Sequence, residues 1–146
     1  MLTNIASSIA TSGRRKILAL SVHLSVLRLL VVVEWGIRQR SLPEVCDRLG
    51  LAFASPDPHH VARPAPDREW VARRVRAVAR LLPLWPFGDT CLRRCLVLGA
   101  LLAEVAPTLV IGVRRAEDQS VVAHSWLEIS GRPVDPTAPS YAVLSS

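Results

Sequence analysis

The chain has 146 residues, half of them hydrophobic, which is enough for one domain around a single buried core. Its 18 Lys and Arg against 12 Asp and Glu give a formal charge of +6, which favours an acidic peptide, a nucleic acid or an anionic membrane as partner. Three cysteines, Cys46, Cys91 and Cys95, exclude an even disulfide framework, and no N-terminal stretch resembles a secretory signal. We therefore expect a cytoplasmic protein.

The first predicted element is a long helix over residues 14–35, with Gly36 as its stop. Residues 17–33 are apolar enough to raise the question of a membrane span. His23 and Arg28 interrupt this stretch, and it is shorter than the roughly 20 apolar residues that a span requires. We interpret it as a buried core helix, with peripheral membrane contact as the alternative.

A second, short helix is predicted from Ser41 to Leu49. Ser41 occupies the N-cap, Glu44 the capping-box position, and Gly50 lies just beyond the end. Cys46, inside this helix, is interpreted as a packing residue.

Four prolines between residues 55 and 66 indicate an exposed linker. His59 and His60 lie in it without companions at metal-ligand spacing, so we interpret them as solvated loop residues. The chain then divides into a helical part (1–54), the linker (55–66) and a catalytic part (67–146), which together form one compact domain.

After the linker, Asp67 caps a helix predicted to run to about Leu82. Apolar residues recur along it at steps of three and four, and its other face carries arginines. These are Arg68, Arg73, Arg74, Arg76 and Arg80. The next helix is predicted from Cys91 to Val105, followed by strands at 108–114, 121–129 and 132–135. Helices followed by an antiparallel meander indicate an α+β fold.

Cys91 is a candidate nucleophile because it falls in the first turn of a predicted helix, whose start Asp89 or Thr90 is placed to cap. Unpaired N–H groups and the positive end of the helix dipole stabilise a thiolate there. Arg93 and Arg94 add positive charge to the same turn. A cysteine packed under the sheet at a helix start is the alternative interpretation.

His124 and Asp135 are predicted to lie on one face of a hairpin that turns at Ser130-Gly131. In that register Ile129 pairs with Arg132, and the imidazole lies roughly 7 Å diagonally from the aspartate at the Cβ atoms. A hydrogen bond can span this separation. Such a pair can orient the histidine of a thiol–imidazole dyad; a half-exposed hairpin with an incidental His and Asp is the alternative.

Four sequence blocks, in order, resemble one family: CLRRCLVL from Cys91, LVIGVR from Leu109, AHSWLE from Ala123 and GRPVD from Gly131. The chain resembles the B protein of lasso-peptide biosynthesis, in the split form in which a separate small protein binds the leader. This family belongs to the transglutaminase-like superfamily. The resemblance implies a papain-like core, with the cysteine helix packed on an antiparallel sheet. Cys95 departs from the family, which more often has Ser or Ala there; it could capture an oxidised Cys91, although a small buried side chain is the favoured interpretation.

The resemblance implies that Cys91 is the nucleophile, His124 the base and then the acid, and Asp135 the residue that orients the imidazole. It further implies a cysteine peptidase that cuts the leader from a precursor peptide, in partnership with a leader-binding protein and an ATP-using lasso cyclase. The oxyanion donors would be the Cys91 N–H and, as a weaker candidate, the indole of Trp85, for which core packing is the favoured alternative. We expect no cofactor, because there is no phosphate-binding loop or metal-ligand cluster.

Two other functions are alternative interpretations of the sequence. A non-catalytic basic adaptor would hold a peptide or nucleic acid, but the few aromatic residues do not alternate with the arginines as stacking platforms do, so we expect no nucleic-acid partner. An acyl transferase would keep the triad and resolve the thioester with an amine in place of water. The sequence does not separate hydrolysis from acyl transfer.

Overall fold

The computed structural model describes the backbone of residues 3–53 and 67–144, and the side chains of residue 20 onward within these ranges. The predicted linker, with His59 and His60, lies outside the described residues. The helices are α1 (Thr3–Gln39), α2 (Leu42–Leu49), α3 (Arg68–Leu81) and α4 (Cys91–Leu101), with 3₁₀ turns at Leu82–Leu84, Ala103–Val105 and Ala138–Ser140. The strands are β1 (Ala52–Phe53), β2 (Thr108–Arg115), β3 (Val121–Ile129), β4 (Arg132–Pro133) and β5 (Ala142–Val143).

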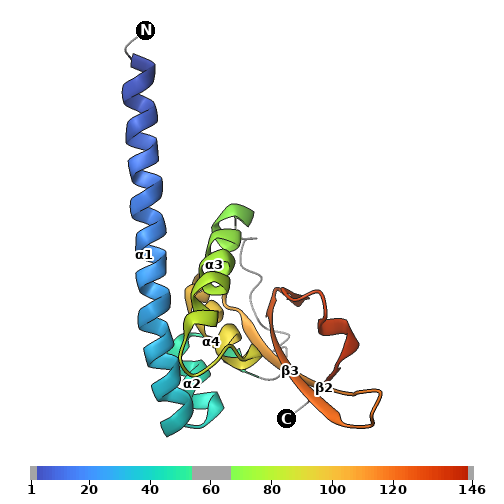
Figure 1. Cartoon of the computed structure of the whole chain (residues 1–146). Helices are drawn as coiled ribbons and strands as arrows, with labels where there is room; N and C mark the ends of the chain where they lie inside the picture. The colour runs from blue at the N-terminus through green and yellow to red at the C-terminus, as the bar shows by residue number, and fades with distance from the viewer. Residues whose placement is uncertain (1–2, 54–66, 145–146) are drawn as a thin grey trace.

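Helix α1 is longer than predicted, and its N-terminal turns extend beyond all other elements (Figure 1). The prediction that Gly36 stops it is wrong, because the helix continues to Gln39. Gly36 is instead the point where α2 packs closely: a Cβ there would lie 3.2 Å from Cγ2 of Val45. The missing side chain at Gly36 allows this close packing, and the backbone of Gly36 remains helical.

Among the α1 side chains that the structure describes, those in the core lie on one face. Val26, Leu30 and Val33 lie in the core, whereas Leu24, Val31 and Trp35 are 58%, 59% and 67% exposed. The prediction of a buried core helix therefore holds for one face alone. Within the described residues one segment, Leu20–Gln39, is long and apolar enough to cross a membrane, judged by length and composition only.

Local capping signals set the starts of the other helices as predicted. Ser41 precedes α2 and its N–H donates to the Glu44 carboxylate at 3.1 Å, while Gly50 ends the helix with a positive φ of 72°. Asp67 accepts from the Glu69 N–H at 3.0 Å, and Thr90 accepts from the Arg93 N–H at 3.3 Å. Cys46 is fully buried, as predicted for a packing residue.

Two predicted elements end earlier than expected. Helix α4 stops at Leu101, and a 3₁₀ turn leads to Ala106, whose φ of 47° is left-handed. Pro107 disfavours helical geometry in the residue before it, so no helix continues through Ala106. Strand β4 ends at Pro133 instead of residue 135.

The sheet has the order β1-β2-β3-β4, with β5 paired to the other part of β2. Strands β2 and β3 are antiparallel, with Gly112 opposite His124 and Leu109 opposite Leu127. The predicted pairing of Ile129 with Arg132 is confirmed, and the Val134 N–H donates to the Leu127 carbonyl at 2.8 Å. The sheet therefore continues for one more hydrogen bond beyond β4, toward Asp135.

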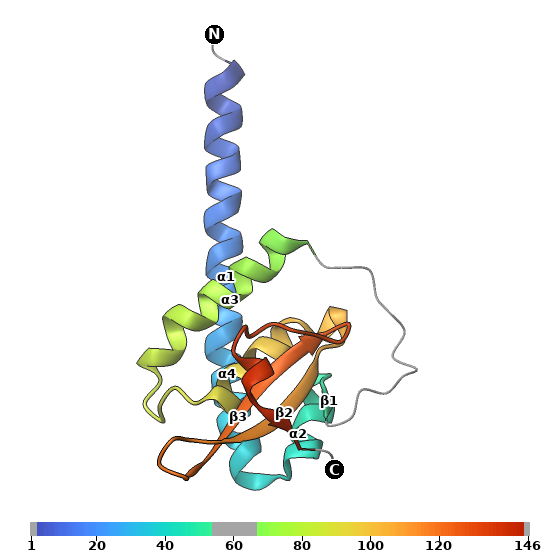
Figure 2. The ribbon, with the colours of Figure 1, turned by 90° about the vertical axis from the view of Figure 1, so that its right-hand side faces the viewer.

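The sheet separates two apolar clusters. Helices α1–α4 pack on the face that carries Leu109 and Leu127, whereas Val110, Trp126 and Ala138 form a smaller cluster on the other face. Figure 2 shows α4 behind the strands and the C-terminal segment in front of them. The predicted α+β fold is confirmed, with the cysteine helix packed on the sheet.

Candidate active site

Cys91 occupies the first position of α4, directly after the N-cap residue Thr90. A cavity of about 440 Å³ opens beside it. The side chains that line the cavity come from α3, α4, β3, the segment before α4 and the chain after β4. Three of these side chains are those of the predicted triad. The lining is formed by Val75, Asp89, Cys91, Arg94, Cys95, Leu98, His124, Ser125, Trp126, Leu127, Val134, Asp135 and Pro136. The fold thus brings Cys91, His124 and Asp135 to one cavity.

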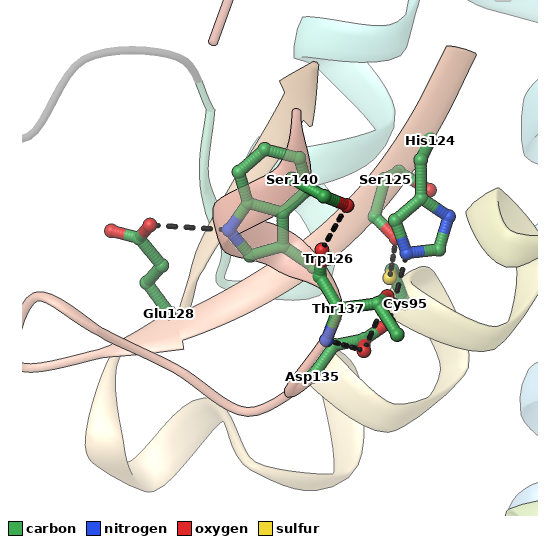
Figure 3. Close-up of polar contacts among 8 residues, drawn as sticks. All are labelled: Cys95, His124, Ser125, Trp126, Glu128, Asp135, Thr137 and Ser140. Atoms are coloured by element: carbon green, nitrogen blue, oxygen red, sulfur yellow. Dashed lines mark hydrogen bonds and ion pairs between the residues drawn. The ribbon is translucent and has the colours of Figure 1, made fainter. Parts of the chain in front are cut away.

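His124 and Asp135 form a hydrogen-bonded pair, with 2.8 Å between Nε2 and Oδ2 (Figure 3). The other carboxylate oxygen, Oδ1, accepts from the backbone N–H and the hydroxyl of Thr137, both at 2.8 Å. Both oxygens of Asp135 are therefore held. Because Nε2 is used by the aspartate, Nδ1 is the imidazole nitrogen left to exchange a proton with a thiol.

The same contacts keep Asp135 ionised. Burial opposes the charge, but the Thr137 N–H, His124 and the Thr137 hydroxyl together hold the pKa of Asp135 below its ordinary value. An ionised Asp135 stabilises an imidazolium at His124.

Aromatic rings pack against the imidazole. The ring centroid of Tyr141 lies 4.9 Å from that of His124, and Trp126 stacks at 6.2 Å. Gly112, opposite His124, makes room for this arrangement: a Cβ there would lie 2.7 Å from Cη2 of Trp126 and 2.9 Å from the Ala142 carbonyl oxygen. These contacts limit the rotation of the histidine ring.

The Cys91 thiol is half-buried and is shifted toward the thiolate. Burial opposes ionisation, but the side chain and N–H of Ser125 and the imidazole of His124 outweigh it and hold the pKa of Cys91 below its ordinary value. The predicted contribution of the nearby arginines is not seen among these causes. Arg93 pairs with Glu34 and Arg94 with Asp89, so both charges are compensated within the structure.

Cys95 differs sharply from Cys91, although both line the cavity. Its buried thiol donates to the Ser125 carbonyl at 3.2 Å, and burial raises its pKa to about 12. A neutral thiol of this kind is a poor nucleophile. The geometry agrees with the interpretation of Cys95 as a small buried side chain.

The structure does not bring Trp85 to the cavity. Its indole packs edge-to-face against Phe87, with centroids 5.8 Å apart, and lies among the groups around the Glu34 carboxylate. The oxyanion donor that remains at the site is the Cys91 N–H, one of the first N–H groups of α4 that the helix itself leaves unpaired. Trp85 packs against the main apolar core, the alternative that the sequence favoured for it.

Three residues of the site were not identified from the sequence: Ser125, Thr137 and Tyr141. Ser125 follows His124, so strand alternation turns it toward α4 and Cys91. Thr137 follows an Asp-Pro pair, a position from which short side-chain turns are common. Tyr141 had no local signal, because its contact with His124 depends on β5 folding back onto β2.

Among the described residues no three His, Cys, Asp or Glu side chains gather closely enough to hold a metal ion. The chemistry that this cavity supports on its own side chains is attack by a thiolate, with proton transfer through an oriented imidazole.

A family model described as the transglutaminase-like superfamily matches residues 29–146, from the C-terminal third of α1 to the end of the given chain. No curated protein matches the chain significantly. No solved structure matches it significantly.

Proposed function

The chain belongs to the transglutaminase-like superfamily, and from this premise we propose that it is a cysteine peptidase that removes the leader from a lasso-peptide precursor. The superfamily fits cysteine-peptidase or acyltransferase-type chemistry. The observation that carries the proposal is the shared cavity: a thiol with a lowered pKa beside an imidazole whose far nitrogen is held by an ionised aspartate. The sequence blocks that resemble the lasso B proteins supply the substrate class.

In the first step the Cys91 sulfur attacks the carbonyl carbon at the leader–core junction, forming a tetrahedral oxyanion. The Cys91 N–H at the start of α4 is placed to donate to that oxygen. The carbon–nitrogen bond then breaks, and the protonated His124 gives its proton to the departing amine. The leader remains on Cys91 as a thioester, and the core leaves with a free amine.

In the second step His124 takes a proton from water, whose oxygen attacks the thioester carbon. The carbon–sulfur bond breaks, the leader leaves as a carboxylic acid, and the Cys91 thiolate returns. Asp135 holds the imidazole in the orientation that both steps require. The free amine of the core is what a lasso cyclase would join to an internal carboxylate.

In this proposal the chain works in the reducing cytosol with two partners, a leader-binding protein and the cyclase. The sequence resemblance supports these partners, and the exposed apolar face of α1 offers an uncovered surface for one of them or for the membrane.

The test uses the full chain, its leader-binding partner and the precursor peptide, with leader release followed by mass spectrometry. We expect release with wild type and none with Cys91→Ala, while Cys95→Ala retains it. Release by the Cys91→Ala protein would exclude the thiolate mechanism, and precursor binding without release by wild type would favour the adaptor. Running the reaction in ¹⁸O-water separates hydrolysis from acyl transfer, because only hydrolysis places the isotope in the leader's new carboxylate.

A further inference from the structure

A second hollow adjoins the catalytic cavity. It has a volume of about 480 Å³ and lies between α3 and the β3–β4 hairpin. Its lining consists of Arg68, Val71, Ala72, Val75, Arg76, Ile129, Arg132 and Val134. Val75 and Val134 line the catalytic cavity as well, so the two hollows lie side by side and share two lining residues; the two together are called the groove. A chain that occupies the cavity at Cys91 can therefore continue into the second hollow.

The second hollow combines an apolar wall with a cationic rim. Val71, Val75 and Ile129 supply partly buried apolar surface from both sides. All its charged lining residues are arginines: Arg68, Arg76 and Arg132. No carboxylate lines it within the part of the chain that the structure describes.

The charges of the rim are only partly compensated. Arg76 pairs with Glu69 at 2.7 Å, in an exposed pair that exchanges readily with water and other anions. Arg68 and Arg132 are exposed, and neither makes an ion pair or hydrogen bond with the described residues. Two guanidinium groups, one from each wall of the groove, are therefore available for an acidic side chain.

We propose that this hollow binds the substrate segment next to the scissile bond and selects a peptide with an acidic side chain beside an apolar one. The inference rests on the proposed function, because it places the peptide relative to Cys91. The apolar residue packs on Val71, Val75 and Ile129, and the carboxylate lies between Arg68 and Arg132. Because the hollow adjoins the cavity that contains Cys91, the acidic residue lies near the scissile bond along the peptide.

Strand addition is not the basis of this recognition. Pro133 lacks an N–H, which weakens β4 as a template for a further strand. Side-chain contacts supply the selectivity, and exposed charge pairs make it sensitive to salt.

The binding experiment uses the full-length Cys91→Ala protein, which cannot acylate. The probes are short Ala-Leu peptides with a neutral rhodamine label, each with Glu at one position, and matched peptides with Gln there. Anisotropy should show about threefold to tenfold tighter binding of Glu peptides, a preference that declines with added salt. In the Arg68→Gln/Arg132→Gln background the preference should disappear. Arg80→Gln, an exposed α3 change outside the groove, is the matched control and should retain it.

Equal binding of Glu and Gln peptides, or a preference that survives the double substitution, would overturn the proposal. A single-stranded oligonucleotide that displaces the Glu peptides at lower concentration than the unlabelled peptide would overturn it too, in favour of a nucleic-acid surface. Acylation of wild type by p-nitrophenyl acetate, a small ester that does not use the hollow, is measured separately. A lack of acylation would count against the proposed peptidase chemistry. The binding experiment would still test the groove independently.

Discussion

At the scale of single residues, the three cysteines show how environment sets reactivity. Cys46 and Cys95 are buried, and burial raises their pKa values to about 11 and about 12. Cys91 is also partly buried, yet Ser125 and His124 reverse the direction of its shift. These two neighbours on β3, and not the helix start alone, give the Cys91 thiol a lower pKa than the Cys95 thiol.

This contrast predicts selective alkylation. Iodoacetamide should modify Cys91 with a rate that rises with pH around a midpoint below about 8.5, the value of a free thiol. Cys46 and Cys95 should remain unmodified in the folded protein at neutral pH, because their thiols are neutral there. Peptide mapping after alkylation identifies the site, and Cys91→Ala serves as the control. A midpoint at or above the free-thiol value would contradict the assigned environment.

The contact between Asp135 and His124 leads to a second prediction, on turnover. Asp135→Asn keeps the side-chain size but removes the charge and replaces one of the two acceptor oxygens with an NH2 donor, which disturbs the orientation of the imidazole, so turnover should fall by about 10²–10⁴-fold with little change in peptide binding. The measurement is kcat against KM for leader release. Thr137→Ala removes only one contact to the same carboxylate and should cost less. An unchanged kcat in Asp135→Asn would show that Asp135 is misassigned.

The pH dependence of stability from Asp135 follows from the direction of its shift. The pKa is lower in the folded chain than in the unfolded chain, so the ionised pair contributes its full stabilisation above the unfolded value of about 3.9. That contribution declines as the pH falls through the lower, folded pKa.

At the scale of elements, a part-buried ion-pair cluster joins α1 to the first turn of α4. The Glu34 carboxylate accepts from Arg93 Nε at 2.8 Å and from Arg38 Nε at 2.7 Å. Arg93 lies two residues after Cys91, so this cluster anchors the same helix turn that carries the thiol. Arg93 first, and Arg38 after it, outweigh burial and lower the pKa of Glu34. The family match begins within α1, which agrees with α1 being part of the folded unit.

Removing the Glu34 carboxylate from this cluster should lower the free energy of unfolding. Glu34→Gln leaves two arginines without their carboxylate, and breaking such a pair destabilises by about 3–5 kcal/mol when it is well buried. The measurement is the free energy of unfolding in urea. Glu69→Gln breaks the exposed pair with Arg76 and should cost no more than about 1 kcal/mol. Equal effects of the two substitutions would show that the Glu34 cluster contributes no special anchoring.

At the scale of the whole molecule, α1 leaves an apolar surface uncovered. The exposed residues are Leu20, Leu24, Leu27, Val31, Val32 and Trp35. An apolar patch of this kind marks an interaction site or promotes association. The opposite face of the same helix is tied to α3 and α4 through Val26, Leu30 and Val33.

This asymmetry predicts opposite effects on the two faces of α1. Leu24→Gln/Val31→Gln should reduce self-association of the purified chain, measured by sedimentation velocity, with little change in its unfolding free energy. Leu30→Ala should leave association unchanged but cost about 2–5 kcal/mol, because it opens a cavity in the core. Association that is insensitive to the double substitution would exclude this face as its cause.

Much of the fold was predictable because its signals are local. Capping residues such as Asp67 and Thr90 announce helix starts through hydrogen bonds spanning two or three residues. Period-two alternation and the Ser130-Gly131 turn gave the β3–β4 register, and with it the pairing of His124 with Asp135. These features depend on neighbours in the chain, so the sequence alone determined them.

Tertiary packing decided the rest, because it depends on residues far apart in the chain. It turned Gly36 from a helix end into a close contact with Val45, and it placed Trp85 beside Phe87 instead of at the cavity. Above all, it packed α4 on the face of the sheet that presents Ser125, and so placed Cys91 beside His124. The residues of the proposed triad could be identified from the sequence. The lowered pKa of the Cys91 thiol arises only from that packing.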